Sequence, residues 1–289
     1  MRRTDQGTSR AQEPTMQSLD VFVVLYRRKI AESETVQSLL RATTACTQLR
    51  LRVQIWDNSP EADANAIILA QDWRYSWSGH NAPLSVAYNA MLLRASSPYV
   101  LVFDQDSRFE PGFLDALCAA MRAVPADMYV PRIAHQGHVV SPGRLRWIKG
   151  APLPGAAPGT LLPRCFTAMM SGLCISQRFL WTLGPAPFDE RLRFYGIDTR
   201  LCRELNLRGG RAYLHRGTLD HDSALRDRRD PAQYVQRKIW LMRSWRHVFD
   251  RNRLERLGVH LYIAWTVLRL VSGPGRRRGA RSILAEVYR

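Results

Sequence analysis

Short apolar runs alternate with segments of helical periodicity along the first half of this chain. The clearest run, residues 99–103, has no polar position and is rich in aromatic and β-branched residues, which predicts a strand buried on both faces. Comparable runs cover residues 19–26, 51–56 and 73–77. Apolar positions at helical spacing lie between them, in segments 32–49, 63–72, 84–93 and 111–124. This alternation predicts an α/β fold with a single Rossmann-like, mostly parallel sheet flanked by helices.

The second half of the chain has a less regular pattern. Residues 127–132 predict one more strand, and prolines with glycines predict long loops between residues 142 and 163. Segment 166–175 predicts a strand interrupted at Ser171 and Gly172, where the backbone could approach a ligand closely. A helix over 199–207, stopped by two glycines, and a strand beginning at 212–214 follow. The expected C-terminal helices cover residues 233–249 and 254–271.

The chain is strongly basic, with 42 Lys and Arg against 25 Asp and Glu and a net charge of +17. Such a surface attracts phosphate-rich partners, which include nucleic acid, anionic lipid and nucleotides. The last segment, residues 226–289, holds 16 of the basic residues and only 5 acidic ones. No helix-turn-helix, RRM or zinc-finger pattern is present, so a nucleic-acid partner is not expected.

Composition divides the chain into three parts. Residues 1–17 are polar without an apolar core, which predicts a disordered tail and not a signal peptide. Residues 18–225 carry the α/β pattern, and residues 226–289 predict a basic, amphipathic helical region. Its longest uncharged apolar run, 257–268, is 12 residues long and too short to span a bilayer. Basic residues interleaved with Trp and Leu suit a helix in the membrane interface, and a core-packing helix with a solvated basic face fits equally well.

The five cysteines are scattered and form no CxxC pair, so neither a disulfide framework nor a zinc ribbon is indicated. They are expected to be buried thiols of a cytoplasmic protein.

Two carboxylates end the clearest apolar run. The sequence Asp104-Gln-Asp106-Ser107 follows this strand directly, and ligands of open α/β sheets bind at the carboxyl ends of strands. Paired carboxylates suit a hard divalent cation whose other positions are filled by water and phosphate oxygens. A strand that ends in a solvated, Asp-rich turn is the alternative.

Four segments together resemble the family 2 glycosyltransferases of GT-A fold, and among them the bacterial rhamnosyltransferase-like members. In chain order these segments are Leu25-Tyr26, Trp56-Asp57-Asn58-Ser59, Asn81-Ala-Pro-Leu-Ser-Val-Ala-Tyr-Asn89 and Asp104-Gln-Asp106-Ser107. The third segment is similar to N-x-G-[IL]-A-x-A-x-N, with Pro83 in place of the glycine and Ser85 in place of the first alanine. The last is similar to the D-Q-D-S form of the D-x-D motif.

A fifth segment, residues 194–202, is similar to the family's F-I-D-x-V-D-x-E-W/F-C-x-R motif. Asp198 occupies the position of the aspartate in V-D. Gly196 replaces the upstream aspartate and Arg200 replaces the glutamate, so one carboxylate of the motif is retained.

The resemblance implies a nucleotide-diphosphate sugar as donor and Mg²⁺ or Mn²⁺ as cofactor. The residues implied to bind the donor nucleotide are Tyr26, Asp57, Asn81, Asn89 and Asp104. The residues implied to hold the metal are Asp104, Asp106 and His221, with His215 as a competing choice for the histidine.

Asp198 is implied to be the general base that deprotonates the acceptor hydroxyl, and a helix N-cap role is the alternative. Ser171 and Gly172 are candidates for the floor of the acceptor site.

These expectations describe a metal-dependent, inverting glycosyltransferase that moves a sugar, with rhamnose as the candidate, to a polysaccharide or lipid-linked oligosaccharide. Its expected location is peripheral, at the cytoplasmic face of the cell membrane, through the basic C-terminus. A nucleotidyltransferase-like enzyme is one alternative; it would need a glycine-rich phosphate loop after the first strand, and residues 27–29 are basic without glycine. A non-catalytic, basic module that binds nucleic acid or membrane is the other.

Overall fold

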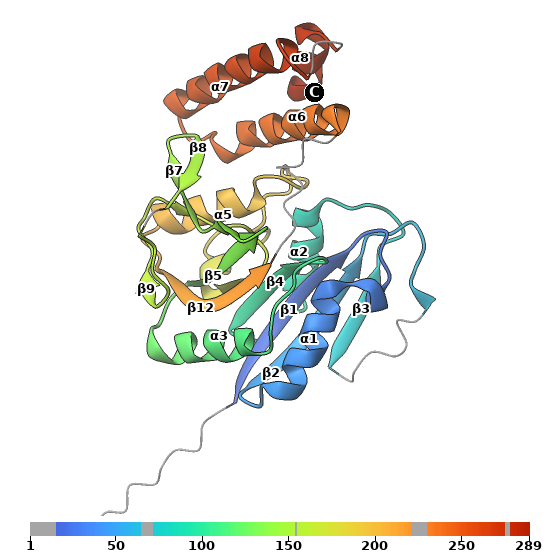
Figure 1. The fold of residues 1–289 in the computed structure, drawn as a ribbon, viewed down its shortest axis with the longest axis vertical. Helices are drawn as coiled ribbons and strands as arrows, with labels where there is room; N and C mark the ends of the chain where they lie inside the picture. The colour runs from blue at the N-terminus through green and yellow to red at the C-terminus, as the bar shows by residue number, and fades with distance from the viewer. Residues whose placement is uncertain (1–15, 65–71, 154, 221–229, 275–277) are drawn as a thin grey trace, which may run out of the picture.

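One large mixed sheet forms the centre of the molecule (Figure 1). The computed structural model describes residues 16–64, 72–153, 155–220, 230–274 and 278–289. Within these ranges the sheet has nine strands in the order β3-β2-β1-β4-β11-β5-β12-β9, with β6 paired to β5. A smaller sheet of three strands has the order β10-β7-β8.

Strands and helices alternate in the first part of the chain, and helices dominate the last part. The strands are β1 (Gln17–Leu25), β2 (Leu49–Asp57), β3 (Trp73–Trp77), β4 (Tyr99–Asp104), β5 (Met128–His135), β6 (His138–Ser141), β7 (Gly143–Arg146), β8 (Lys149–Pro152), β9 (Thr160–Leu161), β10 (Phe166–Thr167), β11 (Leu173–Ser176) and β12 (Ala212–Asp220). The helices are the 3₁₀ turn η1 (Ile30–Glu32), α1 (Glu34–Ala45), α2 (Leu84–Leu92), α3 (Gly112–Ala123), α4 (Gln177–Trp181), α5 (Ile197–Leu207), α6 (Pro231–Val248), α7 (Arg253–Val271) and α8 (Ala280–Tyr288).

The predicted fold class is confirmed. Strands β3, β2, β1 and β4 are parallel to one another, and β12 is parallel to β5. Strand β11 runs antiparallel between β4 and β5 and makes the sheet mixed. The parallel strands need helical crossovers, which cover both faces of the sheet.

Alternate residues of β1 enter two different cores, which explains its uninterrupted apolar run from Val21 to Leu25. Phe22 and Val24 pack with α2 and α5 on one face. Val21, Val23 and Leu25 pack with α1 and α3 on the other. A strand with helices on both faces has no solvated side and therefore needs no polar position.

Several element boundaries differ from the sequence-based expectation. The stretch 142–163, predicted as loops, contains β7, β8 and β9, which have two to four residues each and are too short to show a period. Helix α5 begins at Ile197, and β12 extends to Asp220. Helices α4 and α8 were not predicted, and most of the helix expected over 63–72 lies outside the described residues.

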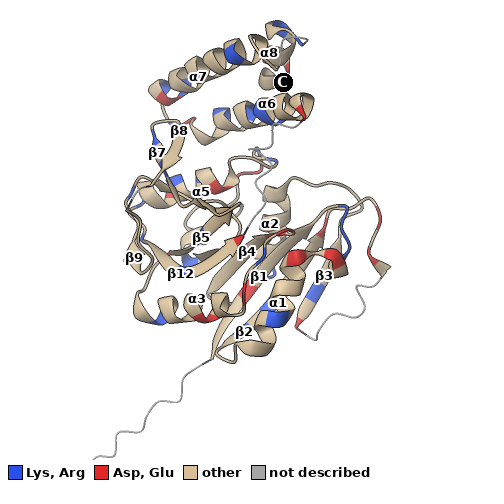
Figure 2. Ribbon diagram, viewed as in Figure 1, with Lys and Arg blue, Asp and Glu red and all other residues tan. Residues whose placement is uncertain are grey.

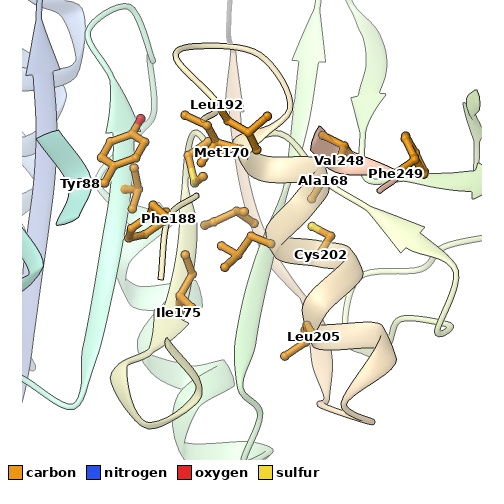
Figure 3. Packing of buried hydrophobic residues seen from close by; sticks show 14 of the residues in the cluster. Tyr88, Ala168, Met170, Ile175, Phe188, Leu192, Cys202, Leu205, Val248 and Phe249 are labelled. Atoms are coloured by element: carbon orange, nitrogen blue, oxygen red, sulfur yellow. The ribbon is translucent and has the colours of Figure 1, made fainter. Parts of the chain in front are cut away.

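The C-terminal helices share a core with the α/β part. Val248 and Phe249, at the end of α6, belong to the same buried cluster as Cys202 and Leu205 of α5 (Figure 3). At the outer side of this core, the indole nitrogen of Trp245 donates to the carbonyl of Ile148, at 3.0 Å. Thus α6 is fixed against both α5 and the β7–β8 hairpin.

The predicted burial of the cysteines holds for all but one of them. No disulfide forms; Cys165 is exposed and the buried thiols are Cys46, Cys118, Cys174 and Cys202. Within the described ranges, none of the helices has both the length and the apolar character needed to cross a bilayer.

Candidate functional site

The carboxyl ends of β1, β2 and β4 bring three of the predicted donor-binding residues to one edge of the sheet. In the β1–β2 register Leu25 pairs with Asp57, and in the β1–β4 register Val24 pairs with Asp104. Tyr26 follows Leu25 directly and is 37% exposed. Asp57, Tyr26 and Asp104 therefore come from three neighbouring strands and lie at the edge where α/β sheets bind ligands.

The loop that carries Asp104 and Asp106 is held from the α1 side. The Thr35 hydroxyl donates to the carbonyl of Asp104, and the Ser33 hydroxyl donates to the carbonyl of Gln105, at 2.8 Å. The Gln105 side-chain oxygen accepts from the backbone N–H of Tyr26, at 2.8 Å. The residue between the two aspartates thus connects this loop to the end of β1.

Asp104 and Asp106 remain partly exposed while their surroundings are fixed. This combination is what a binding loop needs. The carboxylates can reach a ligand, and the backbone is already ordered, so binding does not carry the entropic cost of ordering it.

Ser171 and Gly172, the candidates for the acceptor floor, lie beneath this loop. Ser171 is fully buried; its hydroxyl bonds to that of Ser107 and accepts from the backbone N–H of Asp104, at 3.4 Å. Gly172 has φ +77°, and a Cβ there would lie 2.5 Å from the Leu219 side chain. Close packing against β12 therefore accounts for the glycine, and the geometry gives both residues a supporting role beneath the loop.

Asp57 is buried at the end of β2, with an exposed fraction of 1%. One carboxylate oxygen accepts from the backbone N–H of Ser59, at 2.8 Å, and the other accepts from the Tyr75 hydroxyl, at 2.6 Å. Burial and the hydrogen bond to Asp57 raise the pKa of Tyr75 to about 12, so the phenol stays a donor. These two bonds use about half of the acceptor capacity of a carboxylate.

The two predicted asparagines have different environments. Asn81 is exposed in the loop before α2. Asn89 is 7% exposed, and its amide nitrogen donates to the carbonyl of Phe188, at 2.9 Å, and to the Glu190 carboxylate, at 3.0 Å. Its amide oxygen accepts from the backbone N–H of Phe188, at 3.0 Å. One turn earlier on the same face of α2, the Ser85 hydroxyl donates to the carbonyl of Leu192, at 2.7 Å.

These contacts explain the spacing of Ser85 and Asn89. Residues four apart lie on one face of a helix, and here that face holds segment 188–192, which leads into α5. Each such bond is worth about 0.5–1.5 kcal/mol, and more where its loss leaves a buried group unpaired. The structure therefore gives Asn89 a role in the support of the segment that leads into α5.

Asp198 lies in the first turn of α5. One of its carboxylate oxygens accepts from the backbone N–H of Thr199, at 2.6 Å, and from the Thr199 hydroxyl, at 3.3 Å. Burial raises the pKa of Asp198, and the two bonds from Thr199 only partly oppose this shift. A carboxylate with a raised pKa is the stronger base, which suits proton abstraction. The N-cap itself is Gly196, so the alternative N-cap role of Asp198 is not found.

Asp104 and Asp198 act on a common neighbour, Tyr88 of α2. Burial raises the pKa of Tyr88 well above its ordinary value, and the charges of Asp104 and then Asp198 raise it further. Charges at the end of β4 and at the start of α5 thus both act on this side chain, although the two segments are far apart in sequence.

Both departures from the fifth motif are explained by contacts with α6. Gly196 has φ +86°, and a Cβ there would lie 2.7 Å from Val248. Arg200 donates to the carbonyl of His247, at 3.0 Å, and to the Asp250 carboxylate, at 2.8 Å. The arginine thus satisfies a free carbonyl at the C-terminus of α6, where a cation is also favoured by the helix dipole.

A network of side-chain ion pairs continues from this contact. Arg191 pairs with Asp189, at 2.6 Å, and with Asp250, at 3.0 Å. Burial opposes ionisation of Asp250. Hydrogen bonds from Arg200 and Arg191, together with their positive charges, nevertheless hold the pKa of Asp250 below its ordinary value. The segment before Asp198 is therefore held by α2 on one side and by the C-terminal helices on the other.

The predicted metal ligands fall partly inside and partly outside the described residues. Asp104 and Asp106, two partly exposed carboxylates on a supported loop, fit a hard divalent cation that keeps water and substrate oxygens as its other ligands. No group of three or more His, Cys, Asp or Glu side chains suitable for a metal occurs among the described residues. His221 lies outside those residues; Asp220 before it pairs through its backbone with Arg108, two residues after Asp106.

His215 does not suit the role of metal or phosphate ligand. It is fully buried and stacks edge-on against Phe113, with ring centroids 5.2 Å apart. Burial lowers its pKa to about 3, so it stays neutral, and its Nδ1 accepts from the backbone N–H of Gly217, at 3.1 Å.

Sequence reasoning missed three residues that shape this site: Thr35, Gln105 and Tyr88. Gln105 lies inside the D-Q-D-S segment, but the sequence did not indicate its hydrogen bond with the backbone of Tyr26. No signal in the sequence distinguishes Tyr88 from an ordinary core tyrosine.

Comparisons with known proteins bear on the family and the fold of this chain. The sequence pattern of the family described as Glycosyl transferase family 2 matches residues 20–174. No curated protein sequence matches the chain. Among solved structures, S. aureus TarS 1-349 in complex with UDP is similar, with a TM-score of 0.54 and 14% identity over 84% of this chain and 68% of that one.

A second similar structure is GalNAc-T7 with UDP, GalNAc and Mn²⁺, with a TM-score of 0.50 and 13% identity. The match covers 78% of this chain and 48% of that one. At these identities the similarity establishes the fold alone.

Proposed function

This chain belongs to glycosyl transferase family 2 and has the GT-A fold, and we propose that it is an inverting, metal-dependent transferase that uses a nucleoside diphosphate sugar. The observation that carries the proposal is the pair of carboxylate sites that the fold provides. Asp104 ends a central strand at the ligand-binding edge, Asp198 lies in the first turn of α5, and the charges of both raise the pKa of the buried Tyr88. One site suits the leaving diphosphate and the other the acceptor hydroxyl.

In the proposed reaction, the acceptor oxygen attacks the anomeric carbon on the face opposite to the diphosphate. Asp198 takes the proton from the acceptor hydroxyl as the new carbon–oxygen bond forms. The bond between the anomeric carbon and the diphosphate oxygen breaks, and its electron pair stays with the nucleoside diphosphate. A single displacement of this kind inverts the anomeric configuration.

Asp104 and Asp106 are the residues proposed to hold Mg²⁺ or Mn²⁺. A divalent cation at this loop would neutralise charge on the diphosphate and make it a better leaving group. The similar structure of GalNAc-T7 contains Mn²⁺, which supports the choice of metal. His221, which follows β12, is proposed as a further ligand.

Donor recognition is assigned to the ends of β1 and β2. Tyr26 and Asn81 are exposed and can contact the nucleotide, and Asp57 retains acceptor capacity for a pyrimidine N–H. Both TarS 1-349 and GalNAc-T7 were solved with UDP bound, which supports UDP or dTDP over GDP as the nucleotide. Rhamnose stays our candidate sugar, and a polysaccharide or lipid-linked oligosaccharide our candidate acceptor.

We assign catalysis to residues 18–225 and treat residues 226–289 as a helical extension of the same unit. The shared core supports the treatment of the two parts as one unit, because Val248 and Phe249 pack with α5. The nucleotidyltransferase alternative finds no support in the family match.

A screen of UDP-, dTDP- and GDP-sugars, with and without Mn²⁺, tests the proposal. We expect a UDP- or dTDP-sugar to bind and to be slowly hydrolysed, with tighter binding when Mn²⁺ is present, because the cation links Asp104 and Asp106 to the diphosphate. Calorimetry and release of free nucleotide measure the two effects. If no nucleotide sugar binds under any condition, the proposed function is wrong.

A further inference from the structure

Helix α7 exposes a continuous row of large apolar side chains, which we call the α7 face. It comprises Leu254, Leu257, Leu261, Trp265 and Leu268, which are 48–75% exposed. Their spacing of three or four residues places them on one side of the helix. A single exposed leucine is ordinary, whereas a contiguous apolar row of this length marks an interaction surface.

The opposite side of α7 fixes its orientation. Val259, Ile263, Val267 and Leu270 are buried in the core shared with α5 and α6. A helix that is apolar on both sides cannot turn the outer row inward without exposing the inner one. The helix lies at the end of the molecule farthest from β2 and α1 (Figure 1), so the outer row does not face the large sheet.

The charges around the α7 face are positive. Arg253, Arg256 and Arg269 are exposed along the helix, and the Arg269 guanidinium lies over the Trp265 ring, 4.8 Å from its centroid. The acidic residue of α7, Glu255, pairs with Arg203 of α5 at 2.7 Å and is 17% exposed. Figure 2 shows basic residues on α6 and α7.

We propose that the α7 face docks on a bilayer that contains anionic lipids, with the helix parallel to the membrane surface. Leucine and tryptophan side chains would enter the interface, and the arginines would contact the headgroups. The charge pattern disfavours a second copy as the occupant. Two α7 helices would bring positive charges together, and Glu255, which a helical pair would need for its own ion pairs, is engaged with Arg203.

For the proposed activity, which this docking deepens, the consequence is that the catalytic domain is held at the membrane that would carry a lipid-linked acceptor. Arg203 ties α7 to α5, and the end of α6 packs against Gly196, two residues before Asp198. Docking of the α7 face would therefore fix the domain that carries Asp198 at the membrane surface.

Sedimentation with phosphatidylcholine vesicles, with and without phosphatidylglycerol, tests the docking surface on the full chain. We expect binding to the mixed vesicles that weakens as salt is added. The triple variant Leu257→Ser, Leu261→Ser and Leu268→Ser should lower the partition coefficient by about tenfold or more, because buried apolar area is lost. Leu93→Ser is the matched control, since Leu93 is 74% exposed but lies at the end of α2.

Three outcomes would overturn this proposal: no vesicle binding, equal binding of the triple variant, or a concentration-dependent dimer that the triple variant abolishes. The last outcome would assign the α7 face to a second copy. The assay contains no nucleotide sugar, so its failure would leave the proposed activity standing, and failure of the donor screen would leave the docking result standing.

Tyr88 provides a second, independent observation. Its side chain is 1% exposed, and its hydroxyl has no hydrogen-bond partner among the described residues. The ring packs against Phe188 with centroids 5.2 Å apart, and the hydroxyl points away from that ring (Figure 3). A buried hydroxyl without a partner costs about 1–3 kcal/mol, so a bound group that supplies the partner gains affinity.

We infer that the Tyr88 hydroxyl donates a hydrogen bond to the sugar of the bound donor. This positioning role rests on the proposed function. Burial and the two carboxylate charges raise the pKa of Tyr88, which keeps the phenol protonated and able to donate.

The substitution Tyr88→Phe removes only the oxygen. We expect KM for the best nucleotide sugar of the screen to rise about 3–10-fold, the range of one hydrogen bond, while affinity for the free nucleoside diphosphate is unchanged. Without ligand, the Tm should stay equal or rise, because an unpaired buried group is removed.

Tyr129→Phe is the matched control. Tyr129 is also fully buried, but its hydroxyl donates to the carbonyl of Val124 at 2.9 Å, so this change should lower the Tm. A lowered Tm in Tyr88→Phe, or an unchanged KM for the sugar nucleotide, would overturn the role of Tyr88. The Tm comparison needs no substrate and can be made even if the donor screen fails.

Discussion

Asp198→Asn is expected to lower sugar transfer by about 10²–10⁴-fold, the range for loss of a general base, while donor binding persists. The asparagine side chain keeps the shape and can still accept from Thr199, as Asp198 does. It cannot take the proton from the acceptor hydroxyl. Initial rates of transfer, together with donor affinity from calorimetry, separate the two effects.

The pH profile of the wild-type protein gives this prediction a second measurement. A general base works in its ionised form, and burial raises the pKa of Asp198. As the pH is lowered, the rate of transfer should therefore begin to fall at a higher pH than it would with an ordinary aspartate, whose pKa is 3.8. The residual activity of Asp198→Asn should lack this acid limb.

The same shift predicts the effect on stability. A raised pKa in the folded state means that folding favours protonated Asp198, so its stabilising contribution is present at low pH and is lost as pH rises through that value. Ionised Asp198 therefore lowers the free energy of unfolding at neutral pH. Asp198→Asn should match or exceed the wild-type stability in urea unfolding at pH 7.

Glu204→Gln is the control for Asp198→Asn. Glu204 is a carboxylate of the same helix that pairs with Arg200 and Arg208, and its removal should leave transfer nearly unchanged. If Asp198→Asn retains turnover, the base is another residue and the mechanism proposed above must be revised.

The double variant Asp104→Asn and Asp106→Asn is expected to remove the effect of Mn²⁺ on donor binding. It should also slow sugar transfer, because the activation free energy rises by several kcal/mol, the order contributed by a Lewis acid. Asparagine keeps the size of each side chain but not its charge, so the diphosphate would lose its counter-charge. Titrations of nucleotide sugar at several Mn²⁺ concentrations measure the loss.

Glu110→Gln is the control here, because Glu110 is exposed and only four residues after Asp106. The double variant also tests the non-catalytic alternative. Salt-dependent binding of oligonucleotides that is as strong in the variant as in the wild type, with no nucleotide sugar bound by either, would favour a basic binding module over an enzyme.

Much of the central sheet followed from the sequence. The strands β1, β2, β3 and β4 were predicted from runs rich in apolar and aromatic residues, and the ends of β2 and β4 were placed to within one residue of Asp57 and Asp104. The reason is local: a strand that is covered on both faces, such as β4, needs a run of apolar residues, and polar residues mark its end. The short strands β7 to β9 were missed because two to four residues carry no readable period.

The candidate site was predicted less completely, because its support comes from contacts between distant segments. Asn89 was expected at the nucleotide, whereas its amide binds Phe188, 99 residues later. Ser171 was expected at the acceptor, whereas its hydroxyl bonds to Ser107. A polar side chain in a motif shows its chemistry in the sequence, but its partner depends on which segments pack together.

The sequence by itself determined the order of strands and helices in the first half, the pair of carboxylates after β4 and the basic character of the C-terminus, because each of these depends on residues close together in the chain. Only the tertiary structure decided what those features face. It let the charges of Asp104 and Asp198 act on the same residue, Tyr88, explained Gly196 and Arg200 by their contacts with α6, and left one apolar side of α7 exposed. A helix with two apolar sides does not reveal in its own sequence which side is buried, since that choice is made by the helices that pack against it.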